Sequence, residues 1–337
     1  MPFDSERSHS ALGRRHLLAL GAASLAAHAL PAHAGDAWPT RPIRIVAGQA
    51  PGSSNDSTAR AFADYASQKL GVPVVVENKP GGGGMIAAEN VARSAPDGYT
   101  LLISLHSQPA QAPALLKKPP IDTDRDLLPI AAMGVGPVVG VVNKDFPART
   151  LEEVIAYSKK KPVNIGNYSI GSGWQLMLAQ LAKDTGGQFN VVNYKGTGAM
   201  LMDLYAGTID MGAGSLAGVG AGLDKGAIRS VVITVGERSG RLPGIPRWVD
   251  AGFKGPAYED LAECNMLFAP AGTPPEIARR LADLMVSSVS ESPRIKTVRE
   301  ALHEEGPILT GEPLRQFIDR TWPSYRRMTR ELNLKVD

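Results

Sequence analysis

The sequence predicts an α/β fold, because short β-branched runs alternate with amphipathic helical patterns along almost the whole chain. Runs bounded by Gly or Pro have the length and composition of strands buried between helices. The alternation indicates mostly parallel strands linked through helices. The strand candidates are 43–47, 72–77, 100–104, 138–143, 163–166, 189–194, 209–212, 229–234 and 266–269.

Two helix starts carry capping signals. Thr150 and Glu153 have the Thr-x-x-Glu spacing of a capping box. Thr273 and Glu276 repeat that spacing, with prolines between them at positions where a missing N–H is tolerated. We therefore expect helices to begin directly after Thr150 and Thr273. The second helix continues with an apolar stripe at Ile277, Leu281, Leu284, Met285 and Val289.

The segment 50–56, Ala-Pro-Gly-Ser-Ser-Asn-Asp, lies between the first strand candidate and a helical pattern that opens at Ser57. Free backbone N–H groups in this turn, together with the positive end of the helix dipole, suit a carboxylate or phosphate. In the alternative interpretation, Ser54, Asn55 and Asp56 only cap the helix. The candidate ligand-binding residues of the turn are Gly52, Ser53, Ser54, Asn55 and Asp56.

Four further small, polar turns follow strand candidates, at 104–108, 167–173, 194–198 and 212–215. Ligands of open α/β sheets bind at the carboxyl ends of strands, where such turns gather. We therefore expect the five turns to surround one small ligand. The candidates from these four turns are His106, Ser107, Ser169, Gly171, Ser172, Lys195 and Ser215.

The histidines and Lys195 admit more than one interpretation. His106 can hydrogen-bond a carboxylate or sense pH, or it can be an ordinary surface-turn histidine. Lys195 can reach an anionic ligand as a point charge, or it can point outward. His303 lies in a charged stretch with Glu304 and Glu305 and is expected to be solvated. Two distant histidines and one cysteine in the mature chain give no basis for a transition-metal site.

The first 34 residues have the form of an export signal. Arg14 and Arg15 precede an apolar run, 17–27, that is too short to span a bilayer comfortably, which argues against an uncleaved anchor. Ala-His-Ala at 32–34 has the small-x-small form of a cleavage site, so cleavage is expected near Ala34. The arginine pair suggests the twin-arginine route, with general secretion as the alternative.

Removal of 34 residues leaves 303 and changes the net charge from +3 to +2, because three arginines and two carboxylates are lost. This near-neutral charge gives no case for nucleic acid or an anionic membrane as a partner. About 300 residues with 43% hydrophobic content suit two domains. The single cysteine, Cys264, cannot form an internal disulfide and is expected to be a small buried apolar residue.

Nucleotide and enzyme motifs are weak. The four glycines 81–84 resemble a phosphate loop, but no Gly-Lys-Ser/Thr follows, so we expect a flexible turn that opens a helix from Met85. The chain has no dinucleotide fingerprint, Gly-x-Ser-x-Gly elbow or His-Glu-x-x-His motif. An acid–base pair such as Asp56 with His106 is the remaining catalytic hypothesis, and it requires proximity that a sequence does not show. We expect neither catalysis nor a cofactor.

An ordered set of segments resembles the exported solute receptors of tripartite tricarboxylate transporters, often called Bug proteins. The resemblance covers nearly all of the mature chain, beginning at Trp38. It starts with Trp-Pro-Thr-Arg-Pro-Ile-Arg-Ile-Val at 38–46 and continues with the turn at 51–56. Further matching segments lie at 74–84, 95–102, 194–196, 204–210 and 269–276.

The resemblance implies a two-lobed periplasmic binding fold, type II-like, with two crossover segments and a central cleft. The crossovers are expected near 137–143 and 259–268. Lobe 1 is then 35–140 plus 260–337, and lobe 2 is 141–259. In the family, the turn after the first strand grips a carboxylate largely through backbone N–H groups and ordered water.

Several positions near the expected cleft depart from the family's usual residues. Gly-Gln-Ala at 48–50 replaces Pro-Phe-Pro, and Gln175 stands where His is common. Gly214 and Ser215 replace Asp-Asn, Cys264 and Asn265 replace Trp-Phe, and 106–108 replaces small residues. The departures spare the scaffold and fall at the positions that would select the ligand.

The sequence therefore predicts a periplasmic receptor that closes like a hinge on a small organic acid and presents it to a membrane permease. We expect a monomer that does not bind nucleic acid. A sensory receptor of the same fold for a membrane kinase is the first alternative, and a cleft hydrolase is the second.

Overall fold

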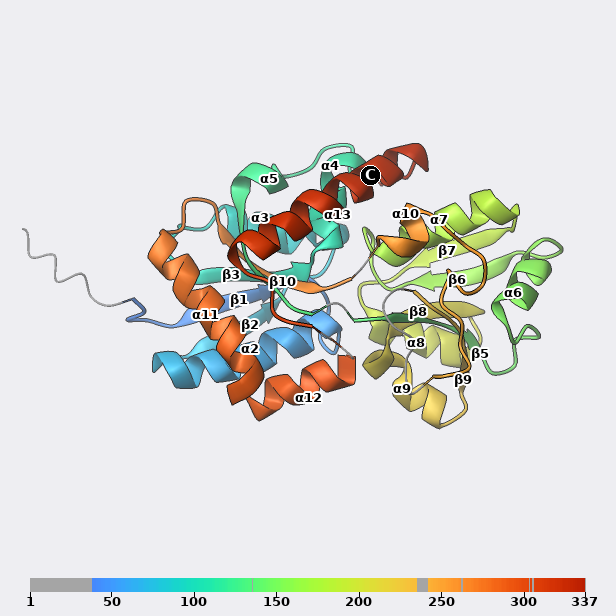
Figure 1. Ribbon diagram of the computed structural model, residues 1–337, viewed down its shortest axis with the longest axis horizontal. Helices are drawn as coiled ribbons and strands as arrows, with labels where there is room; N and C mark the ends of the chain where they lie inside the picture. The colour runs from blue at the N-terminus through green and yellow to red at the C-terminus, as the bar shows by residue number, and fades with distance from the viewer. Residues whose placement is uncertain are drawn as a thin grey trace, which may run out of the picture. The chain divides into compact units, whose positions relative to one another are not determined.

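Two five-stranded sheets, each flanked by helices, organise the chain (Figure 1). The computed structural model describes residues 38–134, 136–234, 242–261, 263–302, 304 and 306–336. The chain from Arg41 onward forms one compact unit. The expected export signal at 1–34, with its arginine pair and cleavage site, lies outside the described residues.

The first sheet, with its helices, makes the first lobe and has the strand order β2-β1-β3-β10-β4. Its strands are β1 (Ile43–Ala47), β2 (Val74–Asn78), β3 (Thr100–Leu105), β4 (Leu127–Ala132) and β10 (Asn265–Pro270). The helical segments of this lobe are α2 (Ser54–Leu70), the 3-10 turn η1 (Gly82–Gly84), α3 (Met85–Ala92), α4 (Ser107–Leu115), α5 (Thr123–Asp126), α11 (Pro275–Glu291), α12 (Pro293–Leu302) and α13 (Gly311–Glu331). Helix α13 packs on α4, and α11 and α12 pack on α2, so the C-terminal helices complete the lobe that the N-terminal strands begin.

The second sheet makes the second lobe and has the order β7-β6-β8-β5-β9. Its strands are β5 (Val138–Asn143), β6 (Val163–Asn167), β7 (Phe189–Asn193), β8 (Met211–Ser215) and β9 (Ile228–Ile233). Its helices are α6 (Leu151–Ser158), α7 (Gly173–Thr185), α8 (Thr197–Ala206), α9 (Leu216–Asp224) and α10 (Pro256–Glu259).

The chain crosses between the lobes twice, between β4 and β5 and again between β9 and β10. The two crossovers meet where the N–H of Gly136 donates to the carbonyl of Glu263 at 3.4 Å. Both crossings lie within or directly beside the segments predicted for them. The lobe boundaries at 140 and 260 stay a prediction, and β5, which spans residue 140, pairs within the second sheet.

Most of the described strands are parallel in direction, as predicted, because four of the five strands in each sheet run the same way, but both sheets are mixed. Among the described strands, β5 runs antiparallel to β8 and β9, and β10 runs antiparallel to β3 and β4, while the other pairings are parallel. Both exceptions are strands that enter a sheet from the other lobe. Because no helix of the same lobe connects them to their neighbours, nothing requires the parallel direction that a βαβ unit imposes.

Strand β4 is absent from the strand candidates, and Pro129 interrupts its apolar run. The structure places β4 at the edge of the first sheet, where a proline is tolerated because no partner needs its N–H. The register with β10 shifts between Leu267 and Phe268, beside Pro129, as expected of a strand that is locally irregular.

The first residues of α6 and α11 can be compared with the two predicted capping boxes. At α6, Thr150 is the N-cap and its hydroxyl accepts from the N–H of Glu153 at 3.2 Å, as predicted. At α11 the prediction is wrong, because the helix begins at Pro275 and has no side-chain cap. The Thr273 hydroxyl donates instead to the carbonyl of Pro270 at 2.8 Å.

The glycine run 81–84 makes the turn into α3, which begins at Met85 as predicted. All four glycines have positive φ, between 56° and 122°. A Cβ on Gly84 would overlap the side-chain amide of Gln108, so this glycine leaves room for a side chain that bridges the lobes. Cys264 is buried, also as predicted.

Candidate ligand-binding site

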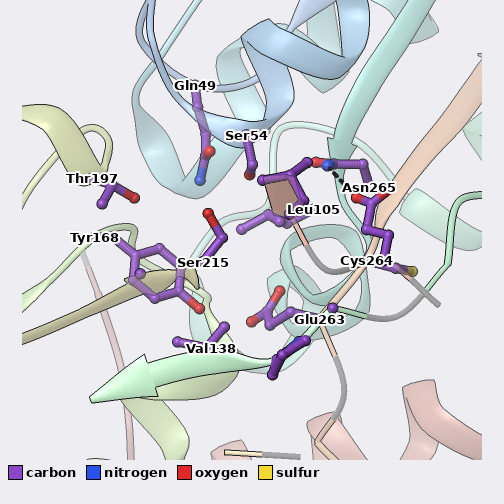
Figure 2. Close-up of a pocket in the computed structure, with 15 residues that line it drawn as sticks. Gln49, Ser54, Leu105, Val138, Tyr168, Thr197, Ser215, Glu263, Cys264 and Asn265 are labelled. Carbon is purple, nitrogen blue, oxygen red and sulfur yellow. Dashed lines mark hydrogen bonds between the residues drawn. The ribbon is translucent and has the colours of Figure 1, made fainter. Parts of the chain in front are cut away.

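A cavity of about 50 Å³ lies between the two lobes. Each of the five predicted turns contributes a residue to its wall, which confirms that the turns gather at one place; these residues are Ser54, Leu105, Tyr168, Thr197 and Ser215. Figure 2 shows the polar ends of Gln49, Ser54 and Ser215 pointing into a common space. A single water molecule needs about 10–15 Å³ of cavity volume. The cavity therefore has room for a small molecule but not for a nucleotide.

The N-terminus of α2 opens at this cavity. Ser53 is the N-cap, with extended backbone (φ −76°, ψ 171°), and its hydroxyl accepts from the N–H of Asp56 at 3.3 Å. The helix therefore begins at Ser54 and not at Ser57. Among the described residues, the N–H groups of Ser54 and Asn55 have no acceptor. Two unsatisfied donors thus lie at the positive end of a 17-residue helix, beside the cavity wall.

The side chain of Asn55 does not line the cavity and contacts the first lobe. It is fully buried, and its amide hydrogen-bonds the side chain of Asn265 on β10. The Asn265 amide donates in turn to the hydroxyl of Thr58 at 3.1 Å. This chain of side chains ties the start of α2 to the returning strand, so the turn has a defined position.

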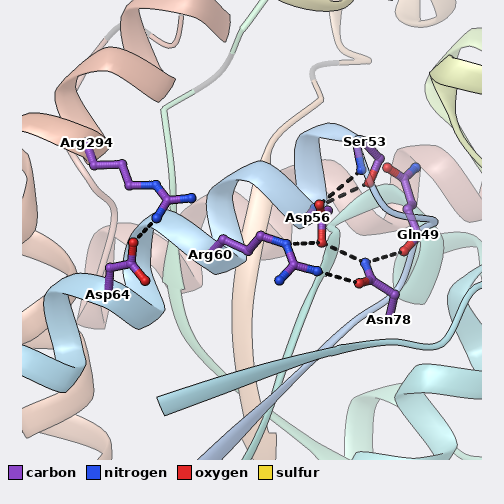
Figure 3. Close-up of polar contacts among 8 residues, drawn as sticks. Gln49, Ser53, Asp56, Arg60, Asp64, Asn78 and Arg294 are labelled. Atoms are coloured by element: carbon purple, nitrogen blue, oxygen red, sulfur yellow. Dashed lines mark hydrogen bonds and ion pairs between the residues drawn. The ribbon is translucent and has the colours of Figure 1, made fainter. Parts of the chain in front are cut away.

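The Asp56 carboxylate forms hydrogen bonds and an ion pair with residues in and around the turn (Figure 3). Its carboxylate accepts from the N–H of Gly52 and the amide of Asn78, each at 3.0 Å, and pairs with Arg60 at 2.9 Å. Burial acts to raise the pKa of Asp56, but the hydrogen bonds from Arg60, Gly52 and Asn78 together bring it below its usual value. The structure therefore places Asp56, and the N–H of Gly52, in the scaffold of the turn and outside the cavity wall.

Replacement of Asp56 by Asn is expected to lower the free energy of unfolding by about 1–2 kcal/mol, because one of its donors then faces an NH₂ group instead of an oxygen. Asp64→Asn is the matched control, since Asp64 lies on the same helix and pairs with Arg294 on the surface (Figure 3). That change is expected to shift stability by less than about 0.5 kcal/mol. Urea unfolding measures both variants, and equal losses would contradict the role given to Asp56.

Three of the candidate residues join the two lobes outside the cavity wall. Ser169 accepts at its hydroxyl from the side-chain amide of Gln108 at 2.7 Å. The carbonyl of Gly171 accepts from Gln111 at 2.5 Å, and the carbonyl of Lys195 accepts from the N–H of Ala50 at 3.1 Å. These contacts describe a closed arrangement of the lobes. The Lys195 side chain is exposed, in agreement with the outward interpretation.

His106 is neither a surface residue nor part of the cavity wall. Its side chain is fully buried, with its ring centroid 5.2 Å from that of Phe317 and 5.3 Å from that of Tyr325. Burial lowers the pKa of His106 to about 3, so the imidazole is neutral at ordinary pH. Its Nδ1 accepts from the N–H of Cys264 at 3.3 Å, which ties the end of β3 to the returning crossover.

Glu263 is a site residue that the sequence did not single out, although it lies in the predicted crossover 259–268. It lines the cavity and is 7% exposed. Its carboxylate accepts from the N–H of Gly173 at the start of α7 and from the hydroxyl of Ser107 at 3.0 Å. Burial raises its pKa to about 7. Ser172, another candidate, is the N-cap of α7 and donates to Asn167 at 2.7 Å.

Glu304 is a second buried acid at the cavity, although it lies in the charged stretch beside His303. Helix α12 ends at Leu302, and Glu304 is 8% exposed and lines the cavity. Burial raises its pKa to about 7, against the opposing charge of Arg299. His303 and Glu305 lie outside the described residues. Charge alone predicts exposure, so nothing in the sequence marked Glu304 as buried.

Two other features, a metal-binding cluster and a membrane-spanning helix, are absent from the described residues. No group of three or more His, Cys, Asp or Glu side chains is placed to hold a metal ion. No helix in this part of the chain is long and apolar enough to cross a membrane.

The chain matches the family described as "Tripartite tricarboxylate transporter family receptor" over residues 58–334. It is 31% identical to Protein BugT of Bordetella pertussis over 307 residues, which cover 89% of this chain and 92% of BugT. A solved R. palustris protein with adipate superposes with a TM-score of 0.80 and 26% identity, covering 89% of this chain and 100% of that one. MatC from Rhodopseudomonas palustris with bound malate gives 0.76 and 27%, covering 87% and 100%.

These matches agree with the segments that suggested Bug proteins and with the two-lobed fold seen here. The family match spans both sheets apart from β1, and the relatives cover most of the chain. The chain therefore belongs to the receptor family of the tripartite tricarboxylate transporters, a family of periplasmic solute-binding proteins.

Proposed function

We propose that this receptor captures a small organic carboxylate in the cavity between its lobes and delivers it to the membrane subunits of a tripartite tricarboxylate-type transporter. The observation that carries the proposal is the pair of unsatisfied N–H groups of Ser54 and Asn55 at the cavity, on the positive end of α2. Oriented amides at a helix N-terminus bind carboxylates without a cationic side chain. The relatives solved with adipate and malate support a carboxylate ligand.

In this proposal some of the candidate residues contact the ligand, and the others hold the site in shape. The N–H groups of Ser54 and Asn55 bind the carboxylate, and the hydroxyl of Ser215 faces it from the second lobe. The residues Gly52, Ser53 and Asp56 hold the turn in shape. The remaining candidates stabilise the closed arrangement or the helix ends that face the cavity; they are His106, Ser107, Ser169, Gly171, Ser172 and Lys195.

Closure is proposed to occur about the two crossovers, which meet at Gly136 and Glu263. A ligand shifts a receptor toward its closed state only by the contacts that it makes better there. Here the α2 amides belong to the first lobe and Ser215 belongs to the second, so a ligand that touches both stabilises closure.

We further propose that the chain is exported through a signal cleaved near Ala34, by the twin-arginine or the general secretory route, and works as a monomer without a nucleic-acid partner. Binding without catalysis is part of the proposal. The buried, neutral His106 lies away from the cavity wall, so it is not available there as a base beside Asp56.

The test is a thermal-shift screen of ligand-free protein, unfolded and refolded, against mono-, di- and tricarboxylates. A ligand at 100 times its Kd adds about 2.7 kcal/mol to the stability of the native state, so at least one acid is expected to raise the melting temperature by several degrees. A protein that no acid stabilises, while it refolds to the native circular dichroism spectrum, would contradict the proposed function.

A further inference from the structure

The two ends of the cavity differ in chemistry. At one end the wall is formed by Ser54 at the start of α2, with its free N–H, and by Gln49. Figure 2 shows Glu263 on the side opposite these two residues, with Ser215 between. Glu304 also lines the wall. The described lining residues include no Lys, Arg or His, so the side chains bring acidic groups and no cation to the cavity.

Glu263 lines the cavity and is fixed in place by hydrogen bonds. The Gly173 N–H bonds one oxygen and the Ser107 hydroxyl bonds the other. A carboxylate has about four acceptor sites on its two oxygens, so each oxygen keeps capacity for another donor. The positive N-terminal end of α7 could bind an anionic ligand. In this chain the Glu263 carboxylate already occupies that position.

Glu304 has an oxygen without a partner. Its Oε1 accepts weakly from the amide of Asn265 at 3.4 Å, while Oε2 is buried and has no hydrogen-bond partner among the described residues. Arg299 is nearby, but its guanidinium donates to the backbone carbonyls of Glu304 and Gly306. A buried acceptor of this kind is normally satisfied by protein, water or ligand. At a cavity wall, a ligand can supply that donor.

Burial raises the pKa of both carboxyls to about 7, although the charge of Arg299 acts against this at Glu304. The site is therefore unfavourable for additional negative charge on this side. A donor group, and above all a cation, would satisfy the acceptors and favour their charged form.

We infer that the ligand of this receptor is a small acid with a single carboxylate at the α2 amides and a hydrogen-bond donor, an ammonium or a primary amide, facing Glu263 and Glu304. This inference rests on the proposed function and narrows its ligand class. It separates this chain from its relatives solved with adipate and malate, which are dicarboxylates. Rejection of a second carboxylate by like charge is a common source of specificity.

The test uses acids matched in chain length, with three to five carbons. Each set contains an ω-amino acid, the corresponding acid with a terminal amide, the dicarboxylate and the unsubstituted monocarboxylate; the four-carbon set is 4-aminobutyrate, succinamate, succinate and butyrate. Calorimetric titration of ligand-free protein at pH 8, above the raised pKa of both glutamates, gives the affinities. The best amino or amide acid is expected to bind at least about tenfold more tightly than its matched dicarboxylate.

Glu263→Gln and Glu304→Gln keep the size of the side chain and remove the charge. Each variant is expected to weaken binding of the amino acid and strengthen binding of the dicarboxylate, so that their affinity ratio falls several-fold. Glu276→Gln, at an exposed position on α11, is the control and leaves the ratio unchanged. Two variants are used so that a folding defect in one does not end the test.

The outcomes separate the two proposals. Dicarboxylates that bind as tightly as the amino and amide acids, or a ratio that neither variant changes, would overturn the inference and leave the proposed function intact. A protein that binds no acid of any set, and that no acid of the thermal-shift screen stabilises, would overturn both.

Discussion

Replacement of Ser54 by proline is expected to reduce the affinity for the bound acid by roughly 10–150-fold while leaving the fold intact. The change removes one N–H that faces the cavity, and a hydrogen bond to a charged group contributes about 1.5–3 kcal/mol. Proline is well tolerated here, because Ser54 is the first residue of α2. The extended backbone of Ser53 (ψ 171°) is also the conformation that a following proline requires.

Ser54→Ala is the matched control, since alanine keeps the backbone N–H and removes only the hydroxyl. Alanine is expected to lose less affinity than proline, and both variants should unfold in urea within about 0.5 kcal/mol of the parent protein. Affinity is measured by titration calorimetry with the acid that gives the largest thermal shift. Proline and alanine variants of equal affinity would remove the backbone amide from the binding account.

A second large effect is expected at the contact between the lobes. Gln108 and Gln111 both lie on α4 and are buried, and their side-chain amides donate across to Ser169 and Gly171. In an open receptor these amides would be hydrated. The double change Gln108→Leu, Gln111→Leu therefore removes two hydrogen bonds between the lobes, worth about 1–3 kcal/mol together. It also removes the hydrogen bonds that these side chains accept from Ser104 and Thr329 within the first lobe, so urea unfolding is measured alongside affinity.

The apparent affinity of a receptor falls with the fraction that can close, so the double variant is expected to bind the acid roughly 5–150-fold more weakly. Small-angle scattering should show a larger radius of gyration for the variant with subsaturating acid than for the parent protein. Gln316→Leu, at an exposed position on α13 of the same lobe, is the control and should alter neither quantity. Unchanged affinity in the double variant would mean that these contacts do not stabilise closure.

Local signals predicted the framework well. The β-branched runs located nine of the ten strands in the described part of the chain, and the Thr150–Glu153 spacing fixed the start of α6. Such features depend only on residues that are close together in the chain, so they can be recognised from the sequence alone. The missed strand β4 carries Pro129, and only its place at the sheet edge makes that residue acceptable.

The site was predicted in outline but not in its chemistry. The five turns gather as expected because they all follow strands that end at the same edges. The roles of Asp56, His106 and Glu263 depend on contacts with residues far away in the chain, such as Asn78, Cys264 and Gly173. Burial decides whether a charged residue lies in solvent or in a cavity wall, and for Glu304 burial is a property of the assembled lobes.

The central claim is that the α2 amides bind the carboxylate, and a crystal structure of the protein with its best-binding acid tests it most directly. We predict a carboxylate oxygen about 2.7–3.2 Å from the backbone nitrogen atoms of both Ser54 and Asn55, with the lobes closed. An acid bound elsewhere, or these two nitrogens satisfied by protein groups instead, would contradict the account.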